Sequence, residues 1–362
     1  MKKIVTVLGA RPQFIKASVV SDALARTSGV REVVVHTGQH FDANMSDVFF
    51  TELGMAQPAH QLDIHGGSHG EMTGRMLIEV EKVLLAEKPD VVLVYGDTNS
   101  TLAGALAAAK LHIPVAHVEA GLRSFNMRMP EEINRILTDR LSRWLFVPTD
   151  AAVGNLLHEG VPRGQIEQVG DVMYDVALHH GARVTPETGL LARLGLGGKR
   201  YLLATVHRAE NTDDPVRLRA IADAMARVGE TMPVVWPMHP RTTAILEGMG
   251  QLQRLRDVLN VLPPLGYLDM VQMEKYAALI VTDSGGVQKE AFFCGVPCVT
   301  LRDETEWVEL VDAGWNRLVT PGNADDVAQA VLGALGSRGK DVRPYGDGKA
   351  AVAIAATLGA QA

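Results

Sequence analysis

A strand-to-helix turn with two consecutive glycines is the stretch of this sequence best suited to bind an anion. The apolar run 277–281 predicts a buried strand, and residues 287–294 are compatible with a helix. Between them, Ser284, Gly285 and Gly286 would present free backbone N–H groups at the helix start, where the helix dipole adds partial positive charge. The glycines also allow a ligand to approach the backbone closely. The pattern indicates a phosphate site, although a tight turn without a ligand would use the same residues.

Further along the same predicted helix, about two turns from its start, lies Glu290. With phosphates on the glycine turn, its carboxylate could accept hydrogen bonds from ribose hydroxyls. A second anion-suited turn follows the first apolar run, where Arg11 and Lys16 flank a predicted helix start. Two basic residues would serve solubility equally well. The two turns together favour a nucleotide-linked ligand.

Carboxylates follow two further apolar runs of the first half. Asp97 comes after the run 91–95, and Glu119 comes after the run 115–118. Ligands of parallel sheets bind outside the carboxyl ends of the strands, so we expect these carboxylates and Arg11 at one edge of a sheet. Positioned carboxylates are suited to general acid/base chemistry and to stabilising a developing cation.

The elements that must position these residues alternate regularly along the chain. Short apolar runs, typical of strands buried on both faces, are separated by helix-compatible segments, which predicts parallel, doubly wound sheets. A second series of this kind begins near residue 201. We therefore expect an α/β protein of two Rossmann-like domains, residues 1–170 and 171–349, with a ligand clamped in the cleft between them. Helix 350–362 is expected to pack back on the first domain.

Composition restricts the partners. The 362 residues carry a net charge of −7 and no Lys/Arg-rich run, which argues against nucleic acid or an anionic membrane as the main partner. No apolar run reaches the roughly 18 residues of a membrane-spanning helix. The N-terminal apolar run ends at Gly9 and predicts a buried strand, not a signal peptide. Cys294 and Cys298 resemble neither a disulfide framework nor a zinc ligand set. We expect a cytoplasmic protein without metal or cofactor.

The motifs taken together resemble those of the non-hydrolysing UDP-N-acetylglucosamine 2-epimerases, whose two-domain fold is of the GT-B type. The resemblance extends over nearly the whole chain, with the motifs in the family's order. They are Gly9-x-Arg11-Pro12-x-x-x-Lys16, Gly38-Gln39-His40, Gly96-Asp97-Thr98, the run 117–123, Pro130-Glu131-Glu132-x-Asn134-Arg135, His207-Arg208-x-Glu210-Asn211 and the run 283–290.

The resemblance implies an isomerase that eliminates UDP to give 2-acetamidoglucal and then adds UDP back, with the proton returned to the other face of C2. It implies that Asp97, Glu119 and Glu131 form the acid/base and electrostatic set, with His207 acting beside them at the diphosphate. Local sequence alone explains Glu131 as an acidic residue stabilising a helix start. Partners implied are a UDP-sugar, UDP and a second copy of the chain in a homodimer. The implied substrate and UDP contacts are Arg11, Lys16, His207, Leu265, Met270, Ser284, Gly285, Gly286, Glu290 and Arg302.

The sequence departs from the better-known bacterial members of this family at several binding positions. Trp307 replaces a binding arginine, whose work Arg302 is expected to share. Met270 stands where an aromatic residue often meets uracil, and Leu265 replaces a glutamine. Some members bind an allosteric substrate molecule near position 42 of the chain. Asp42 replaces the glutamine expected for that binding, so the allosteric contacts are only partly kept here. Regulation by a second substrate molecule is therefore not expected.

These departures, together with the runs 62–67 and 123–130, resemble a close branch that acts on UDP-2,3-diacetamido-2,3-dideoxyglucuronate in O-antigen synthesis. The C6 carboxylate of that substrate could meet Arg128, which surface charge explains equally well. On sequence alone we place UDP-N-acetylglucosamine first and the diacetamido uronate as the alternative.

Three other functions fit parts of the sequence. A retaining GT-B glycosyltransferase would use a similar nucleotide site but fewer carboxylates. A hydrolysing epimerase usually carries a fused kinase domain, for which this chain has no room. A non-catalytic nucleotide-sugar binding module would not need Asp97, Glu119 and Glu131 together.

Overall fold

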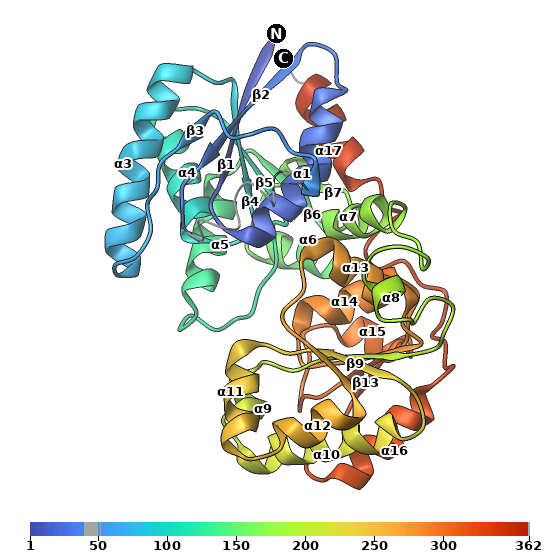
Figure 1. Cartoon of the computed structure of the whole chain (residues 1–362). Helices are drawn as coiled ribbons and strands as arrows, with labels where there is room; N and C mark the ends of the chain where they lie inside the picture. The colour runs from blue at the N-terminus through green and yellow to red at the C-terminus, as the bar shows by residue number, and fades with distance from the viewer. Residues whose placement is uncertain (40–49, 51, 361–362) are drawn as a thin grey trace. The chain divides into compact units, whose positions relative to one another are not determined.

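A computed structural model describes residues 1–39, 50 and 52–360 of the chain. Its internal contacts divide the chain into two compact units (Figure 1). Unit 1 comprises Met1–Val176 and Arg343–Ala362, and unit 2 comprises Ala177–Val342. Each unit is built on one parallel sheet with helices on both faces, so the predicted fold class of two parallel α/β domains is confirmed.

The sheet of unit 1 has seven strands in the order β3-β2-β1-β4-β5-β6-β7, and all neighbouring strands run parallel. The order reverses between β1 and β4, and parallel sheets bind ligands beyond the carboxyl ends of strands at such a reversal. The strands are β1 (Lys2–Leu8), β2 (Val30–His36), β3 (His60–Gln61), β4 (Val91–Tyr95), β5 (Val115–Val118), β6 (Trp144–Val147) and β7 (Ile166–Gln168).

Helices pack on both faces of this sheet (Figure 1). Valines of β1, β2 and β4 form one core with α3 and α4, while α17 lies beside α1 on the other face. The helices are α1 (Arg11–Ala25), α3 (His69–Glu87), α4 (Asn99–Lys110), α5 (Pro130–Leu141), α6 (Asp150–His158), α7 (Val172–Gly181) and α17 (Ala350–Ala360), with a 3-10 turn over Arg163–Gln165.

The last helix is held by a carboxylate from the middle of the chain. Asp175 in α7 accepts hydrogen bonds from the backbone N–H groups of Ala350 (3.1 Å) and Ala351 (2.9 Å). These N–H groups belong to the first turn of α17, which has no partners for them within the helix. Asp175 thereby caps α17 and fixes the helix that packs on α1.

The sheet of unit 2 has six parallel strands in the order β10-β9-β8-β11-β12-β13, with the reversal between β8 and β11. Its strands are β8 (Leu202–Thr205), β9 (Val234–Pro237), β10 (Asn260–Leu262), β11 (Leu279–Thr282), β12 (Cys298–Thr300) and β13 (Asn316–Leu318). Its helices are α8 (Gly189–Arg193), α9 (Ala209–Thr212), α10 (Pro215–Gly229), α11 (Pro240–Gly248), α12 (Leu252–Val258), α13 (Tyr267–Tyr276), α14 (Gly285–Phe293), α15 (Val308–Asp312) and α16 (Ala324–Ala334).

Two separate cores hold these helices to the sheet of unit 2. One core joins the sheet to α10, α11, α12 and α16, and the other joins it to α8, α13 and α14. Both cores consist mainly of buried aliphatic side chains, as expected for strands covered on both faces. Among the described residues, no helix is long and apolar enough to cross a membrane.

Candidate active site

The end of β4 brings Asp97 close to the side chains of Glu119 and Lys16. Gly96 has a φ of +62°, a left-handed conformation that favours glycine. A Cβ atom at Gly96 would lie 3.3 Å from Oε2 of Glu119 and 3.8 Å from Nζ of Lys16. Gly96 therefore lies against Glu119 and Lys16, so the ends of β4 and β5 and helix α1 bring Asp97, Glu119 and Lys16 together.

Glu119 has a strained backbone at the end of β5. Its φ is +71°, although it is not a glycine, and it forms an ion pair with Lys16 of α1. The backbone N–H groups of Glu119 and Ala120 both donate to the carbonyl oxygen of Phe146, each at 3.1 Å. Such strain persists where surrounding contacts determine the conformation, and it is common at functional sites.

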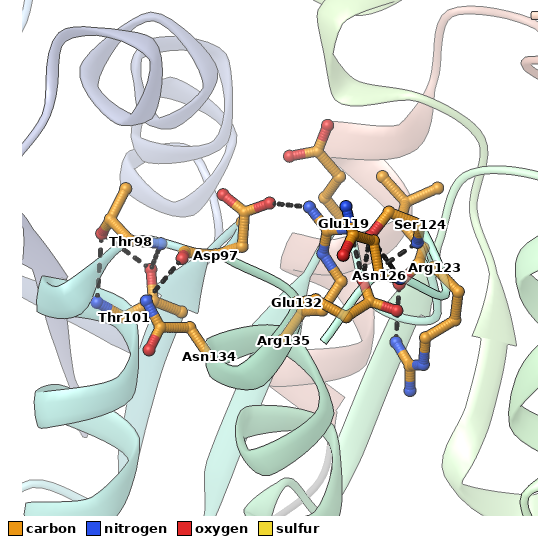
Figure 2. Close-up of polar contacts among 12 residues, drawn as sticks. Asp97, Thr98, Thr101, Glu119, Arg123, Ser124, Asn126, Glu132, Asn134 and Arg135 are labelled. Carbon is orange, nitrogen blue, oxygen red and sulfur yellow. Dashed lines mark hydrogen bonds and ion pairs between the residues drawn. The ribbon is translucent and has the colours of Figure 1, made fainter. Parts of the chain in front are cut away.

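Arg135 of α5 connects two acidic residues (Figure 2). Its guanidinium forms an ion pair with Asp97 and a second one with Glu132, at 2.7 Å between Nη1 and Oε2. The backbone carbonyl of Asp97 also accepts a 2.9 Å hydrogen bond from Nδ2 of Asn134. Both the side chain and the backbone of Asp97 are thus fixed by α5.

Glu132 anchors the loop that precedes α5. Its carboxylate is buried and accepts hydrogen bonds from Ser124 N (2.9 Å), Ser124 Oγ (3.0 Å) and Phe125 N (2.8 Å), as Figure 2 shows for Ser124. Burial opposes ionisation, but these hydrogen bonds and the charge of Arg135 outweigh it and lower the pKa of Glu132 below its ordinary value. The neighbouring Glu131 is exposed and forms no polar contact with the described residues.

The turn after β1 is closed by a side chain that sequence reasoning missed. Gln13 Oε1 accepts the N–H groups of Gly9 (2.8 Å) and Ala10 (3.0 Å), and Gln13 Nε2 donates to the carbonyl of Tyr95 (2.8 Å). The backbone donors expected to face an anion at this turn are therefore occupied. Cationic side chains remain there, with Arg11 partly exposed at the first position of α1 and Lys16 paired with Glu119.

In unit 2, a buried carboxylate holds the segment after β8. Asp283, fully buried at the end of β11, accepts backbone N–H bonds from His207 (3.1 Å) and Arg208 (3.0 Å). It also accepts a 3.1 Å hydrogen bond from Nδ2 of Asn211. The imidazole of His207 remains 45% exposed, with Nδ1 3.4 Å from Asp283. His207 therefore lies at the strand-order reversal of unit 2, beside the start of α14.

The glycine turn forms the start of α14, as its pattern predicted. The first intrahelical N–H bond is from Gln288 to the carbonyl of Ser284, at 3.3 Å. Trp307 packs against this turn, because its Nε1 donates to the carbonyl of Gly285 at 2.8 Å. A Cβ atom at Gly285 would lie 2.3 Å from Oε1 of Glu306, whereas Gly286 is exposed. The backbone of Gly286 is thus accessible at a helix N-terminus suited to anions.

Two acidic side chains, one from α14 and one from α13, are in contact with each other. Glu290 of α14 forms a hydrogen bond with Glu274 of α13, whose exposed fraction is 2%. Burial, together with the charge of Glu290, raises the pKa of Glu274 well above its ordinary value. Glu274 is therefore the protonated partner and donates to Glu290, so it orients the carboxylate that was predicted to meet a ribose.

The remaining predicted contacts lie in the same unit. Arg302 is 6% exposed, and its guanidinium is tied to Glu306 at 2.7 Å. Leu265 and Met270 are partly buried and pack on the core under α13 and α14. The expected regulatory position Asp42, like His40, lies outside the described residues. In the part of the chain that the structure describes, no group of three or more His, Cys, Asp or Glu could hold a metal ion.

Two parallel α/β units, with carboxylates and cations gathered at strand ends in one and a glycine helix start in the other, define a nucleotide-sugar enzyme of the GT-B fold. The family model for UDP-N-acetylglucosamine 2-epimerase matches residues 22–359, and the chain belongs to this family. The predicted family and the predicted enzyme class, an isomerase, are thereby confirmed.

Similar proteins within the family carry two different substrate names. A UDP-2,3-diacetamido-2,3-dideoxy-D-glucuronate 2-epimerase of Pseudomonas aeruginosa is 57% identical over 363 residues, which span 98% of this chain and 99% of that protein. A UDP-N-acetylglucosamine 2-epimerase of Methanocaldococcus jannaschii is 44% identical over 362 residues, 98% of each chain. A crystal structure of the Methanocaldococcus jannaschii enzyme with UDP-GlcNAc and UDP matches with a TM-score of 0.82, 44% identity and 99% of both chains.

Proposed function

We propose that this protein is a UDP-2,3-diacetamido-2,3-dideoxy-D-glucuronate 2-epimerase. The observation that carries the proposal is the 57% identity to an enzyme of that name, spread over 98% of this chain. This identity moves the preference away from UDP-N-acetylglucosamine, which the sequence alone had placed first. The second candidate is the parent UDP-N-acetylglucosamine 2-epimerase, favoured by the 44% identity to a relative that binds UDP-GlcNAc.

The proposed reaction proceeds by elimination and re-addition. The bond between the anomeric carbon and the UDP oxygen breaks, a carboxylate removes the C2 proton, and an unsaturated sugar and UDP result. Cleavage of the anomeric bond is needed because the C2 proton is not beside a carbonyl and is not acidic by itself. UDP then adds back while a proton returns to the opposite face of C2, which yields the manno epimer.

The proposed acid/base and electrostatic set is Asp97, Glu119 and Glu131. Ion pairs with Arg135 and Lys16 direct the carboxylates of Asp97 and Glu119. These paired carboxylates are suited to stabilising positive charge at the anomeric carbon. Glu131, exposed and without such a pair among the described residues, is suited to exchanging a proton.

UDP is proposed to bind at the start of α14. Backbone N–H groups around Ser284, Gly285 and Gly286, together with the exposed ring of His207, would hold the diphosphate. Glu290, oriented by Glu274, would accept from the ribose hydroxyls. We propose that the carboxylates belong to a first domain of residues 1–170 with helix 350–362, and that UDP binds to a second domain of residues 171–349.

Proton NMR in D₂O tests the proposal directly. The purified protein is incubated with the diacetamido uronate nucleotide and, in parallel, with UDP-N-acetylglucosamine. Deuterium at C2 and a manno product from the uronate are expected. Turnover of UDP-N-acetylglucosamine alone would move the assignment to the second candidate. No deuterium at C2 of either sugar would reject both epimerase functions and reopen the glycosyltransferase alternative.

A further inference from the structure

A buried polar network lies directly behind the carboxylates of unit 1. His117 of β5 is 0% exposed, and its Nδ1 lies 2.7 Å from Oδ1 of Asp139 in α5. Its Nε2 lies 2.7 Å from the carbonyl oxygen of Gly96. The side chains of His117 and Asp139 and the carbonyl group of Gly96 do not belong to the proposed acid/base set. Each of them, however, lies on a chain segment that carries one residue of that set.

The hydrogen-bond partners determine where the protons of this network are. A backbone carbonyl can only accept, so Nε2 of His117 carries a hydrogen. Asp139 also receives the N–H of Gly121 at 3.1 Å and Nη1 of Arg123 at 2.8 Å. Burial would raise the pKa of Asp139, but its contacts with His117 and Arg123 outweigh burial and lower it below its ordinary value. The carboxylate of Asp139 therefore holds His117, Gly121 and Arg123 together.

The imidazole ring of His117 joins three segments of the chain. Gly96 immediately precedes Asp97, and His117 lies two residues before Glu119. Asp139 is on α5, about two turns after Glu131 in the same helix. A shift of the ring or of its partner would move three catalytic carboxylates relative to one another.

Stability alone does not account for such a network. A buried ion pair is commonly no more stabilising than well-packed apolar side chains of the same volume. The backbone of Glu119 also needs stabilising contacts from other residues, because its φ of +71° is unfavourable for a residue other than glycine. The hydrogen bonds of this network hold the backbone segments from which the catalytic carboxylates project.

We propose that His117 and Asp139 are a positioning pair for epimerisation, in which a buried imidazole ring sets the relative geometry of Asp97, Glu119 and Glu131. The pair touches no reacting atom and acts through the backbone of β4 and β5 and through α5. This inference rests on the proposed function, because positioning matters only to an enzyme that uses these carboxylates.

The experiment compares His117→Gln and Asp139→Asn with wild type and with the control Val80→Ala. Val80 of α3 is fully buried in a core of the same unit and forms no hydrogen bond with the network, so its truncation is expected to lower stability while these hydrogen bonds remain. We expect kcat to fall by about 100-fold or more in His117→Gln and Asp139→Asn. The KM and the Kd for UDP, which is assigned to unit 2, should change by less than about threefold, and Val80→Ala should retain its kcat.

A kcat for His117→Gln equal to that of Val80→Ala, measured at the same interval below each Tm, would overturn the proposal. Nitrogen-15 NMR of histidine-labelled wild-type protein provides an independent measurement, even if a variant fails to fold. Nε2 of His117 should carry a hydrogen that is protected from exchange by its bond to the carbonyl of Gly96, and a ring without hydrogen on Nε2 would overturn the proposal. If wild type shows no turnover, the proposed function fails, whereas the NMR result still reports on the network.

Discussion

Lys16 of α1 and Glu119 at the end of β5 form an ion pair although 103 positions separate them in the sequence. Both side chains are largely buried, with exposed fractions of 14% and 15%. The family resemblance assigned Lys16 to substrate and diphosphate, whereas in the structure its ammonium group is engaged by Glu119. The cation fixes the position of the carboxylate of Glu119, a residue that also has a left-handed backbone.

The first prediction concerns this pair. Lys16→Met should lower kcat/KM for epimerisation by about 100-fold or more, because Glu119 loses its partner in a partly buried site. Lys16→Arg should recover part of the loss, since it retains the charge with a different geometry. Rates come from NMR of the product, and Tm serves as the control for folding. A kcat/KM for Lys16→Met within about threefold of wild type would contradict a role of the pair in catalysis.

The second prediction separates the adjacent residues Glu131 and Glu132. Glu131→Gln should leave the free energy of unfolding within about 0.5 kcal/mol, since its side chain is exposed, yet lower kcat by about 100-fold or more. Glu132→Gln should lower the free energy of unfolding by about 1–3 kcal/mol, because the buried carboxylate accepts three hydrogen bonds and pairs with Arg135. Urea denaturation and NMR rates check both. Loss of stability in Glu131→Gln without loss of rate would reverse these roles.

A third prediction concerns recognition of the uronate. Arg128 lies two residues before α5, is exposed, and its guanidinium forms no polar contact with the described residues. Arg128→Gln should therefore lower kcat/KM for the diacetamido uronate about tenfold more than for UDP-N-acetylglucosamine, because only the former presents a C6 carboxylate. Arg140→Gln, at an exposed arginine near the end of α5, provides the control. An equal effect on both substrates would show that Arg128 does not read the C6 carboxylate.

The fourth prediction concerns stability in acid. His180 of α7 is 0% exposed, and burial, with the nearby His179 and Arg183, lowers its pKa from 6.5 to about 4. Below about pH 6.5, His180 is protonated in the unfolded chain but stays neutral in the folded chain. The free energy of unfolding therefore falls as the pH drops towards about 4. The loss should reach at most about 3 kcal/mol. His180→Leu should remove this pH dependence, whereas the exposed His158→Gln should retain it, as urea denaturation at a series of pH values would report.

The fifth prediction has the opposite sign. Because burial raises the pKa of Glu274 well above 4.5, the folded chain keeps a proton that the unfolded chain releases as the pH rises. Wild type should therefore lose stability as the pH rises above about 4.5, while Glu274→Gln, which cannot ionise but can still donate to Glu290, should not. The exposed Glu81→Gln should behave as wild type. A parallel pH profile of the free energy of unfolding for Glu274→Gln and wild type would contradict a protonated Glu274.

The strands that form the centre of each sheet could be predicted from sequence because they are continuous apolar runs. β4 and β5 have the predicted bounds Val91–Tyr95 and Val115–Val118. The three-residue strands β10 and β13 were missed, because so short a run carries no period by which to recognise it. Pairing with a neighbouring strand, not local sequence, defines such elements.

Strand ends and helix starts indicated where the candidate site lies, but not how its side chains are held. The sequence placed Asp97 and Glu119 after strands, and the structure brings them to the same edge. It could not predict that Arg135 would pair with Asp97, or that Gln13 would occupy the backbone donors after β1. These contacts join residues far apart in the sequence, so only the folded chain reveals them.

The packing of α17 on α1 has a consequence for the order in which the two units can fold during synthesis. Unit 2 is continuous in sequence, whereas unit 1 needs the first and the last residues of the chain. During synthesis, residues 177–342 leave the ribosome complete and able to fold as a unit. Because α1 is made before residues 177–342 and α17 after them, the face of α1 that α17 buries stays exposed to chaperones and proteases until α17 has been made.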